Sequence, residues 1–186
     1  MTRPELLAEA VLSTKLLLGR YLAGFTEVTH TRSVPDLPNH VAWNLGHLSL
    51  TMHRVAGMID QLAAGGDGSA AVALPVECFV KGDGTRGSRD KGVFDSEAVA
   101  FGSKPEDRYD RYPSLVRCTE IFNLSCDRLA TAIGAAGDEV MGKSVRWGQA
   151  DTVVWALCVR MVFHCGFHTG QIADMRRSLA MKSIFA

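Results

Sequence analysis

The stretch Phe163-His164-Cys165-Gly166-Phe167-His168-Thr169-Gly170-Gln171-Ile172 lies in a long apolar segment near the C-terminus. His164 and His168 are four residues apart, so on a helix they share one face and lie one turn apart. At that spacing two imidazoles can reach one metal ion. The spacing therefore predicts a helix with two adjacent imidazoles, and a metal ion there would need at least one further ligand from elsewhere in the chain.

The helix predicted around this stretch begins with Asp151 as its cap. Its apolar seam alternates spacings of three and four residues: Val154, Leu157, Met161, His164, His168, Gln171 and Met175. Both histidines occupy positions of this seam, and Gln171 extends the polar patch by one turn. Burying one unpaired polar group costs roughly 1–3 kcal/mol. We therefore expect that these side chains hydrogen-bond to other helices or line a wet cavity, or that they bind a metal ion.

Three further helices are predicted upstream, and no strand is. Their predicted bounds are Thr2 to Gly24, Asn39 to Gly66 and Tyr112 to Gly137. The first begins with a capping pattern, Thr2-Arg3-Pro4-Glu5. Residues 141–149 are expected to be a short connection to the last helix. We therefore predict an all-α fold, a four-helix bundle formed by a single domain that spans residues 1–186.

Residues 66–112 form a long irregular connection, rich in Gly, Asp, Ser and Arg. It is longer than a tight turn requires. It either covers one end of the bundle, with Ser96 to Phe101 as a short helix, or joins two helices that run the same way. Gly82 to Gly87 matches the dinucleotide pattern G-x-G-x-x-G, but neither a preceding strand nor a following apolar helix is present. We interpret that match as a surface turn.

The second predicted helix carries a polar stripe beside its apolar seam: His40, Asn44, His47, Thr51 and Arg54. We interpret most of the stripe as a solvated flank. His47 differs because it lies in mid-helix and borders the seam, where it can face a neighbouring helix. His30 and His40 lie at or beyond helix ends, and His53 falls on the far side. Position alone therefore makes His47 the best third ligand.

Composition limits the classes of partner. The 20 basic and 20 acidic residues give a net charge of zero, which argues against a general nucleic-acid or anionic-membrane surface. No apolar run reaches the ~18–20 residues that span a bilayer, and the N-terminus lacks the apolar core of a signal peptide. The five cysteines are an odd number without a close-spaced pair, which suits reduced thiols. We expect a cytoplasmic protein in which Cys165 packs as a small apolar residue.

The segment Trp43-Asn44-Leu45-Gly46-His47-Leu48, taken with His164, His168 and Gly170-Gln171-Ile172, resembles the DinB-like superfamily. The resemblance covers the layout of the whole chain. It implies an up-down-down-up bundle with a long crossover between its second and third helices. It also implies that His47, His164 and His168 bind a divalent metal inside the bundle, and that the protein is a homodimer. We expect no adjoining sulfatase-modifying-like domain, and so a protein that differs from the ergothioneine-pathway type.

Three neutral imidazoles leave a divalent ion with open positions for water, a thiolate or a substrate oxygen. Zinc is the default ion, with nickel, iron or manganese as alternatives. The resemblance implies a metal-dependent S-transferase or isomerase that uses a low-molecular-weight thiol such as bacillithiol or mycothiol on a small-molecule substrate. Gln171 would orient a bound cofactor or water, or hydrogen-bond to another helix. The alternatives are metal-assisted hydrolysis and a non-enzymatic, stress-related metal- or ligand-binding bundle. The sequence names no catalytic general base.

Overall fold

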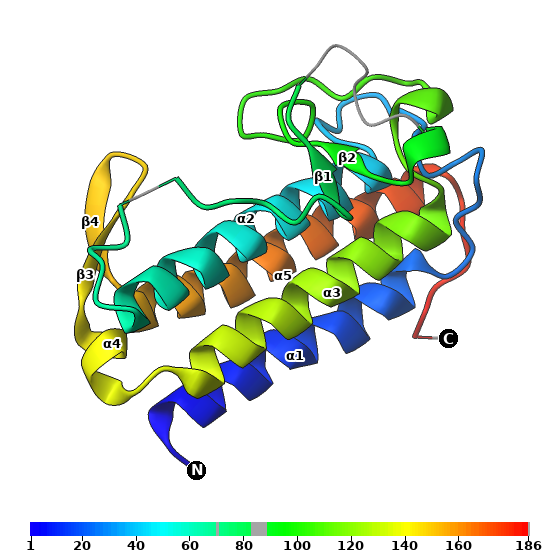
Figure 1. The fold of residues 1–186 in the computed structure, drawn as a ribbon. Helices are drawn as coiled ribbons and strands as arrows, with labels where there is room; N and C mark the ends of the chain where they lie inside the picture. Colours follow the sequence, from blue (N-terminus) through cyan, green and yellow to red (C-terminus); the bar gives the residue numbers. More distant parts are fainter. Residues whose placement is uncertain (70, 83–88, 186) are drawn as a thin grey trace.

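In the computed structural model, residues 1–69, 71–82 and 89–185 are described, and their fold is mostly helical (Figure 1). The helical elements are α1 (Arg3–Leu22), α2 (Val41–Ala63), α3 (Leu115–Ala135), the short α4 (Asp138–Gly142) and α5 (Val154–Ser178). Each long helix lies within the segment predicted for it, so the expectation of a helical fold is confirmed. The expectation that the chain has no strand is wrong, because two pairs of short strands are present.

The four long helices pack side by side in a ring of contacts. Helix α1 packs against α3 and α5, and α2 packs against the same two helices. Figure 1 shows that α2 and α3 run in one direction while α1 and α5 run in the other. The chain must therefore return along the full length of α2 before α3 begins. This requirement accounts for the long connection between them, one of the two alternatives that the sequence left open.

Local capping signals predict the start of α1 correctly but misplace the cap of α2 by one residue. Thr2 caps α1 as predicted: its hydroxyl accepts from the Glu5 N–H at 3.3 Å, and its own N–H donates to the Glu5 carboxylate at 2.7 Å. The cap of α2 is His40 and not Asn39, because Nδ1 of His40 accepts the Trp43 N–H at 3.1 Å. An imidazole can cap a helix in this way only in its neutral form.

A β-hairpin replaces the predicted short connection before α5. Strands β3 (Ser144–Trp147) and β4 (Ala150–Val153) pair antiparallel around a two-residue turn. Gly148 adopts a φ of 63° in this turn, a left-handed conformation that glycine tolerates best. Asp151 lies in β4, where it pairs with Arg146 at 3.2 Å, and so it does not cap α5. Helix α5 begins two residues later than predicted, with Val153 and not Asp151 at its N-cap position.

The crossover between α2 and α3 carries the second strand pair. Strands β1 (Phe79–Val80) and β2 (Phe94–Asp95) run parallel, and two short 3-10 helices, η1 (Arg89–Lys91) and η2 (Tyr109–Arg111), lie in the same region. Residues 96–101 form turns and not the short helix that was considered. Most of the glycine-rich match at residues 82–87 lies outside the described residues.

The crossover docks on α2 beside the predicted third ligand. A Cβ atom added to Gly46 would lie 2.7 Å from Val99 Cγ1 and 2.8 Å from two ring carbons of Phe94. A side chain of any size at position 46 would therefore force the crossover away from the helix. The glycine permits the close approach that brings the backbone of Val99 to His47.

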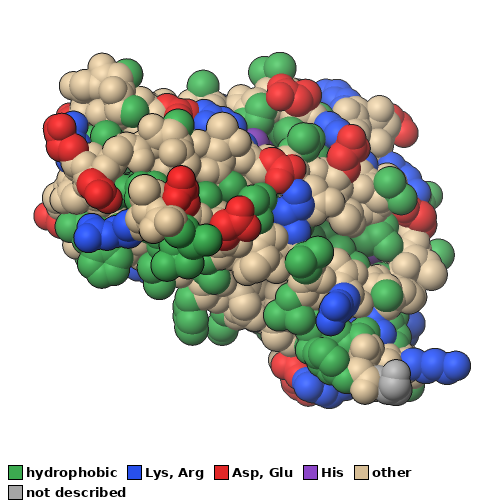
Figure 2. All heavy atoms as spheres, turned by 90° about the horizontal axis from the view of Figure 1, so that it is seen from below, with side chains coloured by type: hydrophobic (Ala, Val, Ile, Leu, Met, Phe, Trp, Pro, Cys, Tyr) green, Lys and Arg blue, Asp and Glu red, His purple; other side chains and the backbone are tan. Residues whose placement is uncertain are grey.

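The molecular surface carries both signs of charge. Figure 2 shows Lys and Arg side chains interspersed with Asp and Glu and with apolar patches on the face seen from below. Among the described residues, no helix combines the length and apolarity required to cross a bilayer.

Candidate metal centre

Helices α2 and α5 bring three histidines together. His47 comes from α2, and His164 and His168 come from successive turns of α5. One ligand nitrogen from each lies within 4.8 Å of the other two. Within residues 1–69, 71–82 and 89–185, this is the one group of three or more His, Cys, Asp or Glu side chains whose ligand atoms converge in this way. The three predicted ligands are thus adjacent, and the group could bind a metal.

Hydrogen bonds fix the tautomers of two of the rings. Nδ1 of His47 lies 2.8 Å from the carbonyl oxygen of Val99, which can only accept, so Nδ1 carries the proton. Nδ1 of His168 lies 2.6 Å from the amide oxygen of Asn44 and 3.2 Å from that of Gln171, so it too carries a proton. Nε2 of each of these two rings is therefore unprotonated and carries a lone pair. Partners of this kind are typical of metal-binding histidines.

His164 supplies the clearest sign that a cation suits the cluster. Its Nε2 faces Nε2 of His168 at 3.0 Å, and its Nδ1 is buried without a hydrogen-bond partner. Because the proton of His168 lies on Nδ1, a neutral cluster without a cation must place the proton of His164 on Nε2. A cation between the rings would instead accept the lone pairs of both Nε2 atoms. The residues present therefore fit a divalent ion.

All three imidazoles are neutral at physiological pH. Burial, reinforced by the neighbouring imidazoles, lowers the pKa of His168 to about 3. Burial, His47 and Arg160 together lower the pKa of His164 to about 4, and burial also lowers the pKa of His47. A histidine must be neutral to coordinate a metal ion, so the site is prepared to bind one without releasing protons from these rings.

Two further side chains hold the cluster in place. The indole ring of Trp43 stacks on His47, with centroids 4.6 Å apart and an interplanar angle of 11°. Its Nε1 donates to the hydroxyl of Ser103 in the crossover at 2.9 Å. Gln171 lies beside His168 as the seam predicted, and its amide oxygen also accepts from Asn39 Nδ2 at 3.0 Å. Gln171 thus orients His168 in this structure, and its contact with a cofactor stays a prediction.

A pocket of about 810 Å³ opens over the histidines. Its walls come from α2, α5, the crossover at Phe101 to Ser103 and the hairpin turn at residues 147–150. Arg54 and Arg160 line it, and the described lining residues include no Asp or Glu. The sequence did not indicate that the hairpin and the crossover would complete this pocket, because the hairpin was predicted as a short connection and residues 101–103 lie more than 50 residues from His47 along the chain.

The prediction that most of the polar stripe of α2 is a solvated flank is wrong. His40, Asn44 and Thr51 are buried and not solvated, because the crossover and α5 cover that side of the helix. Only Arg54 is exposed. The spacing of four and three residues was the signal that could have identified Asn44 as a partner of the site, since it places Asn44 one turn before His47.

The remaining histidines and Cys165 lie outside the cluster. His53 is on the far side of α2, edge-on to Phe79 at 5.8 Å, as expected. His40 caps α2, and Nε2 of His30 faces the carbonyl oxygen of Pro113 at 3.0 Å. Cys165 is buried, and burial raises the pKa of its thiol, which suits a packing role.

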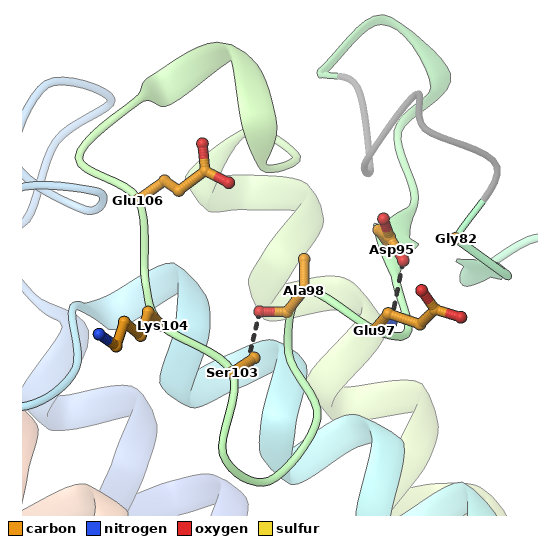
Figure 3. Close-up of a pocket in the computed structure, with 7 residues that line it drawn as sticks. All are labelled: Gly82, Asp95, Glu97, Ala98, Ser103, Lys104 and Glu106. Atoms are coloured by element: carbon orange, nitrogen blue, oxygen red, sulfur yellow. Dashed lines mark hydrogen bonds between the residues drawn. The ribbon is translucent and has the colours of Figure 1, made fainter.

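A second pocket lies within the crossover and has a different character. It is lined by Asp95, Glu97, Lys104 and Glu106 and has a volume of about 500 Å³. Figure 3 shows Asp95 and Glu97 on one stretch of the loop and Glu106 on another, with Ser103 bonded to the carbonyl of Ala98 between them. Its carboxylates do not converge on one point, so the histidine cluster is the better candidate for a metal.

Comparisons with known proteins support the fold but do not assign a family or a function. No protein-family model matches the chain, and no curated protein matches its sequence. The structure is similar to the crystal structure of a conserved protein from Enterococcus faecalis, with a TM-score of 0.66 over 97% of this chain and 98% of that one. The two sequences are 13% identical, so the likeness concerns the arrangement of the chain alone.

Proposed function

We propose that this chain is a DinB-like four-helix bundle that binds a divalent metal ion through His47, His164 and His168. The convergence of three neutral imidazoles within 4.8 Å carries the proposal. The parallel course of α2 and α3, with a long crossover between them, supports the up-down-down-up arrangement of that superfamily. Zinc suits three imidazoles best, and nickel, iron and manganese are the alternatives.

The reaction that we propose is thiol transfer or thiol-dependent isomerisation on a small electrophile. A bound ion would supply a position at which a low-molecular-weight thiol is held as thiolate, the nucleophilic form. His47, His164 and His168 would hold the ion, while Asn44 and the Val99 carbonyl orient two of the three rings. The pocket of about 810 Å³ has room for a thiol together with its electrophile. The five unpaired cysteines suit a reducing compartment such as the cytoplasm.

Hydrolysis is the weaker alternative because the described lining of the pocket has no carboxylate to act as general base. A non-enzymatic, stress-related metal- or ligand-binding role would need neither a thiol nor an electrophile. Two assays separate the three roles: transfer of glutathione or cysteine to monobromobimane, and hydrolysis of a panel of esters and amides, each with and without a chelator. Metal-dependent acceleration that His164→Ala abolishes would support the transferase. A panel of esters and amides hydrolysed in its place would support the hydrolase, and no turnover with a bound metal would support the binding role.

We further propose a homodimer formed through the outer face of α5. Trp155, Val159, Phe163 and Phe167 follow one another every four residues and are 42%, 48%, 72% and 55% exposed. This spacing places them on one face of the helix. A contiguous apolar face of this kind is typical of an interaction site. Phe167 also lines the pocket, so a second copy would border the proposed reaction site.

A further inference from the structure

Two arginines in the pocket have no counter-charge. Arg54 on α2 and Arg160 on α5 both line it, and within the described residues neither makes an ion pair or a side-chain hydrogen bond. Some other arginines of the helices do have a carboxylate partner: Arg128 on α3, for example, forms an ion pair with Asp60 on α2. Two guanidinium groups that face one cavity without a carboxylate give that cavity a positive potential. A bound divalent ion would increase it.

The helix geometry places both arginines toward the same end of the site. Arg54 follows His47 by seven residues, and Arg160 precedes His164 by four. Because α2 and α5 run in opposite directions, both displacements point toward the hairpin end of the molecule (Figure 1). At 1.5 Å per residue, they amount to about 10 Å and about 6 Å along the helix axes. Each arginine also lies on the same face of its helix as the histidine, since the spacings are seven and four.

Aromatic side chains complete the wall between the histidines and the solvent. Phe101 from the crossover, Phe167 from α5 and Trp147 from the hairpin line the same pocket. Phe101 is 95% exposed, so its ring is accessible to a ligand that enters the pocket. The pocket thus combines imidazoles at one end, guanidinium groups toward the other and apolar rings at its rim. Ligand sites commonly have this mixture of apolar walls and few polar groups.

We propose that Arg54 and Arg160 recognise an anionic group of the ligand, a carboxylate or a phosphate, about 6–10 Å along the helix axes from the atom that reaches the histidines. This inference rests on the proposed function, and it specifies that the thiol used in the proposed reaction carries an anionic group. Guanidinium groups bind carboxylate and phosphate oxygens by paired hydrogen bonds. The aromatic rim then covers the apolar part of the same ligand.

The test is a calorimetric titration of the metal-loaded protein with three probes. Glutathione carries carboxylates, 4′-phosphopantetheine carries a phosphate, and pantetheine is the neutral thiol. We expect one anionic probe, or both, to bind more tightly than pantetheine, and the Arg54→Gln and Arg160→Gln variants each to weaken that binding about 10-fold or more. Pantetheine should bind all variants equally. Arg20→Gln, an exposed arginine of α1 outside this pocket, is the matched control and should change nothing.

Separate outcomes contradict the two proposals. If neither anionic probe binds more tightly than pantetheine, or if the two arginine variants bind the probes as the unmodified protein does, the anion site is refuted. Metal content, measured on the same samples, should be equal in all of them. A wild-type protein that takes up no metal but binds anionic probes through Arg54 and Arg160 refutes the metal function and leaves the anion site standing.

Discussion

Replacing Gly46 by alanine tests whether the crossover holds the metal centre together. The added methyl would lie 2.7 Å from Val99 Cγ1 and 2.8 Å from the Phe94 ring, closer than carbon atoms approach without a shift. Overpacking of this kind costs about 1–3 kcal/mol. The exchange of glycine for alanine within a helix contributes about 1 kcal/mol in the opposite direction. We therefore expect a net loss of up to about 2 kcal/mol in the free energy of unfolding.

The second consequence concerns His47. The clash displaces Val99, whose carbonyl oxygen accepts the Nδ1 proton of His47 at 2.8 Å. A less well-oriented ring should bind metal about 10-fold more weakly, the lower end of the range for lost outer-shell partners. An account in which the crossover is only a surface loop predicts no such coupling between a packing change and metal affinity.

Urea unfolding followed by far-UV circular dichroism measures the first effect, in the presence of chelator so that metal binding does not contribute. A competition titration with a chromogenic chelator measures the second. Gly19→Ala is the matched control: position 19 lies within α1, and an added Cβ there meets nothing within 4 Å. That variant should gain up to about 1 kcal/mol. A Gly46→Ala protein as stable as Gly19→Ala, with unchanged metal affinity, would refute the reasoning.

Three further predictions follow from single contacts. Burial lowers the pKa of His40 to about 4, against 6.5 in the unfolded chain, so stability should fall as the pH decreases from 6.5 toward 4. The variant His40→Asn keeps a capping side chain but does not titrate in this range. Its free energy of unfolding should therefore fall by up to about 3 kcal/mol less than that of the wild type over the same pH range, as urea unfolding at several pH values would show. Asn44→Leu should weaken metal binding about 10-fold to 100-fold by removing the acceptor 2.6 Å from His168 Nδ1; an unchanged affinity in the chelator competition would exclude Asn44 as an orienting group. Phe163→Asp should convert the proposed homodimer to a monomer in light scattering, while Leu16→Asp on the exposed face of α1 should not, and a wild-type monomer at high concentration would exclude the dimer.

The long helices and the three histidines of the candidate metal centre could be predicted from the sequence. The apolar seams of α2 and α5 are regular over about six turns, so the sequence predicts which face of each helix is buried. His164 and His168 are local to one helix, so their adjacency follows from spacing alone. His47 required a choice among histidines on other segments, and its mid-helix position decided that choice.

The positions of the crossover and the hairpin could not be predicted from the sequence, because they depend on packing between distant segments. Asn44 looked like one member of a solvated flank, yet the flank is buried by segments more than 50 residues away along the chain. The hairpin was missed because four-residue strands are too short for alternation to distinguish them from a loop. The sequence favours Asp151 as a helix cap, but in the structure Asp151 pairs with Arg146 across the hairpin. The pocket therefore emerged only from the assembled fold.

The most direct test of the central claim is elemental analysis of the protein purified without a metal-affinity tag. We predict about one divalent ion per chain in the wild-type protein, and loss of that ion in His47→Ala, His164→Ala and His168→Ala. His53→Gln, a buried histidine outside the cluster, should keep its metal and serves as the control. A wild-type protein that holds no stoichiometric ion after incubation with zinc, or a His164→Ala variant that keeps the full amount, would contradict the assignment of the metal centre.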